Sequence, residues 1–174
     1  NEEYFAKAEQ MVDMAVAEGF APVLGVLWCS YVPGTRCSQG SPVAAAMPLA
    51  AIAPYATYAA QRFARFDPIF FISGDTRFEA PDEEPYYMAA LQAVKAVCPD
   101  ALLTMHLHPE GDLPPAFVDA VDFYMYQSGH GAGRRPALRP ARRRGRGRHR
   151  RRHRRHQLRC QPGPPGAHPL DPRD

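Results

Sequence analysis

Residues 68–75 read Pro-Ile-Phe-Phe-Ile-Ser-Gly-Asp, an apolar run that passes directly into Ser73, Gly74 and Asp75. An apolar run without alternation is typical of a strand buried on both faces, as in a parallel sheet. A similar run covers residues 20–28, and two more follow at 101–108 and 122–127. The sequence therefore predicts four strands, near residues 20–28, 69–74, 101–107 and 122–127.

Amphipathic segments separate these runs. Apolar residues recur at three- and four-residue steps over residues 2–18, through residues 55–66 and from Pro85 to residue 98. Asn1 is a suitable N-cap for the first helix, and Gly19 is a natural residue at its C-terminal end. Pro54 is expected in the first turn of the second helix, and Pro99 stops the third. A short helix is expected over residues 115–121.

Helices that alternate with strands through short links predict right-handed βαβ units and a parallel sheet. A complete (β/α)8 barrel takes about 250 residues, so four strands in 130 residues predict a partial TIM barrel with outer helices. A flavodoxin-like open sheet is the alternative. No Gly-rich phosphate loop follows any of the strands, which disfavours a nucleotide-binding doubly wound fold.

The chain divides into two chemically different parts near residue 130. Residues 1–130 hold 6 basic and 16 acidic residues, a balance of −10, and all 18 aromatic residues. Residues 131–174 hold 15 Arg, no Lys and two acidic residues, a balance of +13. Such a segment has too little apolar surface to form a core and is expected to be disordered when free. The sequence thus predicts a body over 1–130 and a separate Arg-rich tail over 131–174.

Two interpretations of the tail remain open. Its segment 134–159 could be a nucleic-acid-binding arm whose guanidinium groups neutralise phosphates. Alternatively, Arg, Pro, Gly, Ala and His are the residues that GC-rich codons give in a shifted reading frame, and we favour this second interpretation. The acidic body and the absence of interleaved aromatic residues in the tail both disfavour nucleic-acid binding.

Other classes of protein are disfavoured by simple features. No apolar stretch approaches the length of a membrane span. The first residues are not a signal peptide; if the full-length protein is secreted or periplasmic, its signal would lie upstream of Asn1. The four cysteines form no CxxC pair and do not fix the compartment. No cofactor is expected.

Asp75 is the strongest candidate for chemistry, because it ends an otherwise apolar strand. A carboxylate in that position can act as a general acid or base, although capping the next loop or pairing with Arg77 would also explain it.

His106 and His108 would share one face of a strand. They could bind a metal, but no third ligand is apparent; hydrogen-bonding to a polyhydroxylated ligand and a structural role are the alternatives.

Aromatic and polar residues accompany these candidates at the other strand ends. Trp28, Tyr124 and Tyr126 could stack on a sugar ring, or could simply be core residues. Gln127, Ser128 and His130 form a dense polar cluster after the fourth predicted strand. In a (β/α)8 barrel the C-terminal ends of the strands carry the active site.

These motifs carry a resemblance to a known family. Phe-Phe-Ile-Ser-Gly-Asp75, then Thr-Met-His-Leu-His-Pro109, then Asp122-Phe-Tyr-Met-Tyr-Gln-Ser-Gly-His130 resemble successive strand-end motifs of the apiosidase-like glycoside hydrolases, a (β/α)8-barrel family. The resemblance covers residues 1–130. It implies a carbohydrate substrate, from plant or microbial polysaccharides, and hydrolysis of a glycosidic bond by two carboxylates.

The resemblance also implies roles for individual residues. Asp75 matches the general acid/base, whereas a second carboxylate is expected in a Gly-Glu-Pro-like motif after residue 130. The sequence has no such motif, and its only acids beyond that point are Asp171 and Asp174. We therefore expect this chain to be a truncated and inactive enzyme. The expected substrate-binding residues are Trp28, Arg77, His106, His108, Tyr126, Gln127, Ser128 and His130.

Overall fold

The structure is a computed structural model that describes residues 1–40, 46–80, 82–109 and 111–127. Three strands form its sheet: β1 (Val23–Trp28), β2 (Ile69–Gly74) and β3 (Leu103–Thr104). The helices are α1 (Glu2–Ala17), α2 (Arg36–Gly40), α3 (Leu49–Phe63), α4 (Glu83–Val97) and α5 (Pro115–Val118). Two 3₁₀ turns, η1 (Cys29–Tyr31) and η2 (Ala64–Phe66), follow β1 and α3.

The sheet is parallel, in the order β1-β2-β3. Strand β2 lies in the centre, and its first and last residues pair with Val23 and Trp28 of β1. On its other side Phe70 and Phe71 pair with the two residues of β3. The α/β class and the parallel arrangement predicted from the sequence are confirmed, and all three strand ends point to one edge of the sheet.

The prediction of a fourth strand over residues 122–127 was wrong for the described residues. A single parallel bridge, between His106 and Met125, and a hydrogen bond from the Asp122 N–H to the Leu103 carbonyl at 2.8 Å mark its place. Side chains occupy the neighbouring ladder positions: the Asp122 carboxylate accepts a hydrogen bond from the Leu103 N–H, and the Thr104 hydroxyl donates to the Phe123 carbonyl. Strand β3 has only two residues, Leu103 and Thr104, instead of the seven expected over 101–107, and its pairing with β2 covers these two residues alone.

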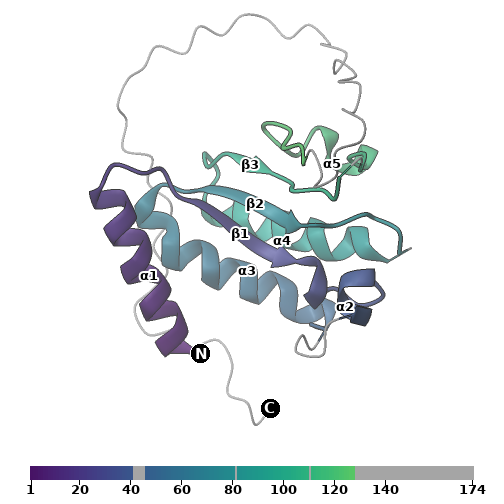
Figure 1. Cartoon of the computed structure of the whole chain (residues 1–174), viewed down its shortest axis with the longest axis horizontal. Helices are drawn as coiled ribbons and strands as arrows, with labels where there is room; N and C mark the ends of the chain where they lie inside the picture. Colours follow the sequence, from purple (N-terminus) through teal and green to yellow (C-terminus); the bar gives the residue numbers. More distant parts are fainter. Residues whose placement is uncertain (41–45, 81, 110, 128–174) are drawn as a thin grey trace, which may run out of the picture.

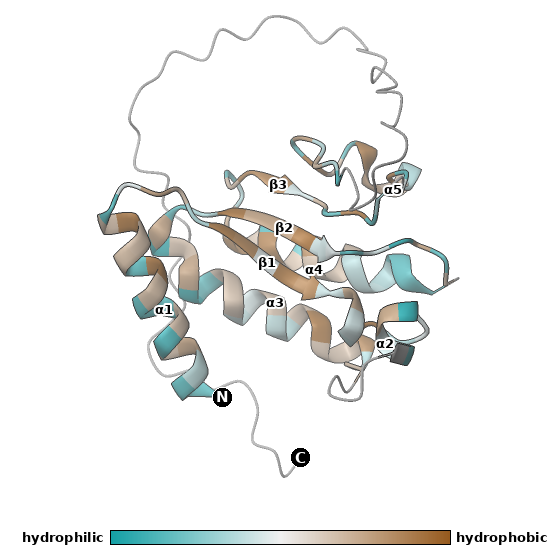
Figure 2. Cartoon of the chain, viewed as in Figure 1, coloured by the Kyte–Doolittle hydropathy of each residue, from teal (hydrophilic) through white to brown (hydrophobic). Residues whose placement is uncertain are grey.

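Helices α3 and α4 lie side by side and cover one face of the sheet (Figure 1). The strands are among the most hydrophobic parts of the chain (Figure 2). Core residues from sheet and helices, among them Ile52, Phe70, Ile72, Val94 and Leu103, are almost fully buried. Burial of this apolar surface is the main driving force for packing the two layers.

The opposite face of the sheet is more open. Val23 and Trp28 are 45% and 43% exposed, and Gly25 between them is exposed as well. Strand β1 is therefore not buried on both faces along its length, contrary to the prediction. The reason is that α3 and α4 cover only one side of it, and β1 has a strand partner on only one of its edges within the described residues.

The helices lie close to the predicted positions, although α5 ends at Val118, three residues before the predicted end, and α2 lies where no helix was predicted. Helix α3 starts at Leu49, so Pro54 lies in its second turn and Pro48 takes the N-cap position. Helix α4 starts at Glu83, two residues before Pro85. No helix in the described parts of the chain is both long and apolar enough to cross a membrane.

Helix α1 is attached mainly by polar contacts. As predicted, the Asn1 side chain caps it by accepting from the Tyr4 N–H at 3.2 Å, and Gly19 after its end has a φ of 88°. No residue of α1 is buried. The aromatic contacts of α1 with α3 come from Phe5, whose ring centroid lies 4.9 Å from that of Tyr58 and 6.4 Å from that of Phe63. The half-buried Ala8 and Val12 lie beside Phe5 in a hollow that Ala59 and Phe63 of α3 also line.

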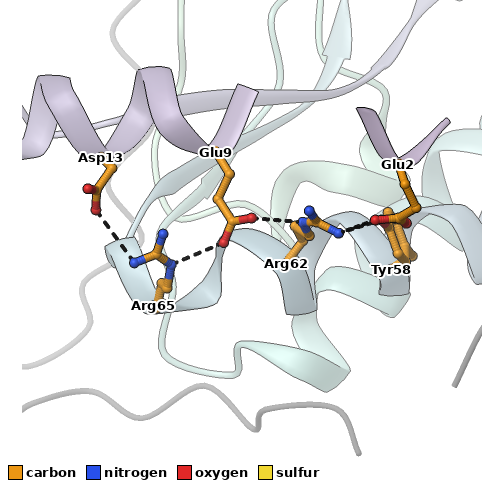
Figure 3. A network of polar contacts seen from close by, with 6 residues as sticks. All are labelled: Glu2, Glu9, Asp13, Tyr58, Arg62 and Arg65. Carbon is orange, nitrogen blue, oxygen red and sulfur yellow. Dashed lines mark hydrogen bonds and ion pairs between the residues drawn. The ribbon is translucent and has the colours of Figure 1, made fainter. Parts of the chain in front are cut away.

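Three carboxylates on α1 face two arginines (Figure 3). Arg62 donates to Glu9 at 3.0 Å and to Glu2 at 2.6 Å, and Glu2 also accepts a hydrogen bond from Tyr58. Arg65 reaches the second oxygen of Glu9 at 3.2 Å. Burial and the hydrogen bond to Glu2 raise the pKa of the Tyr58 phenol, so this side chain stays neutral over the physiological range. The remaining contact joins Arg65 to Asp13.

The two arginines provide a matched test of this attachment. We expect Arg62→Ala to lower the free energy of unfolding by about 1–2 kcal/mol, because the Arg62 side chain is only 22% exposed and binds two carboxylates. Arg65→Ala should have an effect of at most about 0.5 kcal/mol, because its side chain is 57% exposed. Urea unfolding at low salt and in 1 M NaCl measures both, and salt should shrink the difference. Equal effects of the two substitutions would contradict this account.

Candidate active site

A cavity of about 380 Å³ lies where the ends of the strands meet. It is formed by the segments that follow β1 and β2, by the start of α4, and by residues beyond β3. The residues that line it are Cys29, Thr35, Arg36, Cys37, Asp75, Thr76, Arg77, Glu79, Glu83, His108, Pro109 and Gln127.

Asp75 enters this cavity directly from the end of β2. Its backbone has a φ of 52°, in the left-handed region that non-glycine residues seldom adopt and that carries strain of about 1 kcal/mol or more. Its carboxylate is about a third exposed. With the Gln127 amide oriented to suit both its neighbours, the amide nitrogen donates to Asp75 Oδ1 at 2.9 Å and to the Leu107 carbonyl at 3.1 Å. A neutral amide donor thus holds the partly exposed carboxylate of Asp75.

His106 lies against Asp75 on the neighbouring strand segment. The Asp75 N–H donates to His106 Nδ1 at 3.3 Å, and the same nitrogen lies 3.5 Å from Asp75 Oδ1. Because Nδ1 accepts this hydrogen bond, a neutral His106 carries its proton on Nε2. The ring is stacked on Trp28, with centroids 6.3 Å apart and planes 24° apart.

Gly74 permits this arrangement. A Cβ atom at Gly74 would lie 2.0 Å from Cε3 of Trp28, so the indole lies against the bare backbone. Trp28 also contacts Phe71 at 6.4 Å between ring centroids. The result is a partly exposed aromatic surface beside Asp75, suited to the apolar face of a ring-shaped ligand.

Charged side chains form a row along the rim of the cavity. Arg36 and Arg77 each contact Glu79 at 3.3 Å. Arg77 also contacts His108 Nε2, while His108 Nδ1 lies 2.9 Å from the Pro109 carbonyl. Because an arginine N–H can only donate, Nε2 accepts from Arg77 and Nδ1 donates to the Pro109 carbonyl. Arg77 bonds with these two groups rather than with Asp75.

Beneath the rim lies a second carboxylate, Glu83, which is 1% exposed. It accepts hydrogen bonds from the Thr76 hydroxyl at 2.9 Å and from the Ala80 N–H at 2.8 Å. One turn further along α4, burial raises the pKa of the Tyr87 phenol far above its usual value, so that Tyr87 stays neutral. The sequence analysis missed Glu83, because a Glu at the start of a helix is most often an exposed residue.

A disulfide joins Cys29 to Cys37, with Cα atoms 5.6 Å apart. The loop it closes is also held by Thr35, whose hydroxyl donates to the Cys29 carbonyl at 2.7 Å and accepts from the Ser38 N–H at 3.0 Å. The sequence analysis missed this pair, since it looked for CxxC spacing. The available signal was two cysteines on either side of a Pro33-Gly34 turn that follows a strand.

The structure brings part of the predicted site together. Asp75, Arg77, His108 and Gln127 line the cavity. Trp28 and His106 lie beside Asp75 rather than on the cavity wall.

The remaining predicted residues are elsewhere. Tyr126 is 68% exposed and, with Tyr124, lines a different hollow near α5. Ser128 and His130 lie outside the described residues, as does the Arg-rich segment 134–159. Among the residues that the structure describes, no group of three or more His, Cys, Asp or Glu side chains could hold a metal ion.

A parallel α/β sheet with a cavity of charged and polar side chains at its C-terminal strand ends has the arrangement of part of a (β/α)8 barrel. The comparison with protein families agrees: residues 1–161 match the family described as "Apiosidase-like, catalytic domain". The chain belongs to this family. The matched range extends beyond residue 130, where the strand-end motifs of the resemblance stop. No curated protein matches the chain.

Solved structures show the same fold. The structure of a glycoside hydrolase family 5 protein from Bacteroides vulgatus ATCC 8482 matches with a TM-score of 0.59 and 22% identity, over 73% of this chain and 26% of that one. A second, titled "Glycoside hydrolase", matches with a TM-score of 0.58 and 23% identity, over 77% of this chain and 30% of that one. The chain thus spans less than a third of the length of these structures. Together with the family match, they show that the chain has part of the fold of glycoside hydrolase barrels.

The contact between Gly74 and Trp28 can be tested by fluorescence, because Trp28 is the single tryptophan of the sequence. We expect Gly74→Ala to push the indole outward, since the new Cβ would lie 2.0 Å from it. Acrylamide quenching of the emission should rise, and stability should fall by about 1–3 kcal/mol. Val23→Ala, at the exposed start of β1, is the control and should leave quenching unchanged. Quenching that is equal in Gly74→Ala and the parent would show that Trp28 does not lie on Gly74.

The disulfide can be tested by peptide mapping under non-reducing conditions. Trypsin cleaves after Arg36, so Cys29 and Cys37 fall in different peptides, which should run as one species until a reductant is added. The double substitution Cys29→Ser and Cys37→Ser should lower the free energy of unfolding by about 2–3 kcal/mol, the loop-closure value for a loop this short. Separate peptides before reduction would refute the pairing.

Proposed function

We propose that the protein hydrolyses glycosidic bonds in plant or microbial polysaccharides, with Asp75 as the general acid/base. The observation that carries this proposal is the placement of Asp75: a partly exposed carboxylate at a strand end, in a cavity, held by a Gln127 donor and flanked by His106. A group that must exchange protons with a ligand needs such access and such fixed orientation.

The surroundings of Asp75 suit a saccharide. Trp28 offers an aromatic face that is 43% exposed, next to the polar groups of the cavity. Arg77, His108 and Gln127 offer donors and acceptors along one wall, which hydroxyl groups of a sugar could use. His106 belongs to the proposed binding surface through its place between Trp28 and Asp75. Tyr126 lines a different hollow and is left out of the proposed binding surface, and Ser128 and His130 lie outside the described residues.

Hydrolysis by two carboxylates needs a second group about 5–9 Å from the first across the scissile bond. The other two carboxylates of the cavity are already engaged, Glu79 by Arg36 and Arg77 and Glu83 by Thr76 and Ala80. Beyond residue 130 the sequence offers only Asp171 and Asp174. We therefore propose that the second catalytic carboxylate is missing from this 174-residue chain.

We also propose that the strands that complete the barrel are encoded after codon 130 in another frame of the same DNA. The composition of residues 131–174 supports this, whereas the family match up to residue 161 supports a genuine tail. Translating the other two reading frames distinguishes the two interpretations of residues 131–174. A frame that continues the barrel with a Glu at a strand end would support a frameshift, and the absence of an open frame would support a genuine tail.

The decisive experiment compares the 174-residue chain with the frame-restored chain on a panel of aryl glycosides. The 174-residue chain should release no more aryl alcohol than its Asp75→Asn variant, because it lacks the second carboxylate. In the frame-restored chain, Asp75→Asn should lower kcat by about 10²- to 10⁴-fold, whereas Glu79→Gln, in the same cavity, should keep most of it. Full activity of the Asp75→Asn variant would refute the role of Asp75.

We propose that the protein resides in an oxidising compartment, such as the periplasm or the outside of the cell. The Cys29–Cys37 disulfide supports this, because disulfides seldom persist in the reducing cytosol. An acidic body that acts on polysaccharides outside the cell is consistent with it.

A further inference from the structure

The loop from Asp75 to Ala80 connects β2 to α4 and holds two non-glycine residues in the left-handed region. These are Asp75, with a φ of 52°, and Phe78, with a φ of 54°. Backbone in this region persists only where the surroundings hold it in place. The position of the Asp75 carboxylate therefore depends on what anchors the loop.

One buried carboxylate anchors both ends of the loop. Glu83 Oε2 accepts a hydrogen bond from the Thr76 hydroxyl at 2.9 Å, and its Oε1 accepts from the Ala80 N–H at 2.8 Å. Glu83 and Thr76 are each 1% exposed. Since water does not compete at this depth, these two bonds are stronger constraints than those at the surface.

Thr76 also connects the loop to the third strand. Its carbonyl accepts from the His108 N–H at 2.9 Å, in a parallel bridge that continues the pairing of β2 with β3. The residue next to Asp75 is thus fixed on two sides, by α4 through its side chain and by the β3 segment through its backbone. The contacts of Glu79 with Arg36 and Arg77, by contrast, are solvent-exposed and constrain little.

From these contacts we propose that Glu83 is a positioning residue for Asp75. It acts through the Thr76 hydroxyl, fixing the left-handed backbone that turns the Asp75 carboxylate into the cavity and points its N–H at His106 Nδ1. The inference rests on the proposed function only for the role of Asp75; the geometric claim stands or falls separately.

The test is nuclear magnetic resonance on the ¹⁵N-labelled 174-residue chain. The hydrogen bond from the Asp75 N–H to His106 Nδ1 provides two signals: the Asp75 amide proton and the His106 ring nitrogen. Thr76→Val removes the hydroxyl but keeps the shape, and should shift both signals toward values for groups without this bond. Thr76→Ser keeps the hydroxyl and should leave both signals as in the parent. Glu83→Gln, which presents an amide group to one of two donors, should shift them as Thr76→Val does.

Two further variants separate positioning from a general loss of stability. Val94→Ala shortens a fully buried side chain of α4, and should lower Tm without moving the two signals. If Thr76→Val or Glu83→Gln does not fold, the double variant Thr76→Val with Glu83→Met removes both partners of the Thr76–Glu83 bond and leaves only the part-buried Ala80 N–H without its acceptor. Unchanged Asp75 and His106 signals in folded Thr76→Val, or in the double variant, would overturn the proposal.

The outcomes also separate this inference from the proposed function. Shifted signals in Thr76→Val together with full activity of Asp75→Asn in the frame-restored chain would support the positioning and refute the catalytic role. Unshifted signals in Thr76→Val together with loss of activity in Asp75→Asn would support the catalytic role of Asp75 and refute its positioning by Glu83.

Discussion

Strand β2 pairs in parallel with β1 on one side and β3 on the other, and the candidate site takes its geometry from this pairing. The pairing places the residues after each strand at one edge of the sheet. It sets Trp28 opposite Gly74, so that the indole lies on bare backbone and reaches His106. Because β2 is central, Asp75 at its end lies between the segments that follow both neighbours.

Sequence reasoning succeeded where local pattern decides the structure. The limits of β2 were predicted to the residue, because an unbroken apolar run lies between Pro68 and the polar residues after Gly74. The cap of α1 at Asn1 was predicted for a similar reason, since it depends on only a few neighbouring residues. The convergence of Asp75 and His108 follows from the parallel pairing of β2 with the β3 segment, whereas Gln127 reaches the cavity although the strand predicted before it does not form.

Sequence reasoning failed where distant groups compete for the same partners. The apolar run at 122–127 resembles a strand, yet Asp122 and Thr104 use their side chains to bond backbone groups that a ladder would otherwise pair. The burial of Glu83 could not be predicted, because it depends on the packing of α4 against the loop after β2, whereas the Cys29–Cys37 disulfide is local and left a signal in the turn between the two cysteines. The exposure of one face of β1 could not be predicted for a similar reason, because it depends on where α3 and α4 pack in the folded protein.

Helix α1 gives the fold an unequal distribution of stability. It contributes no buried residue, and ion pairs and the ring of Phe5 hold it to α3 and η2. Local opening exposes only the surface that an element buries, so detaching α1 requires much less free energy than unfolding the sheet with α3 and α4. The protein can therefore lose its first helix to fraying while β1, β2 and the cavity at their ends stay formed.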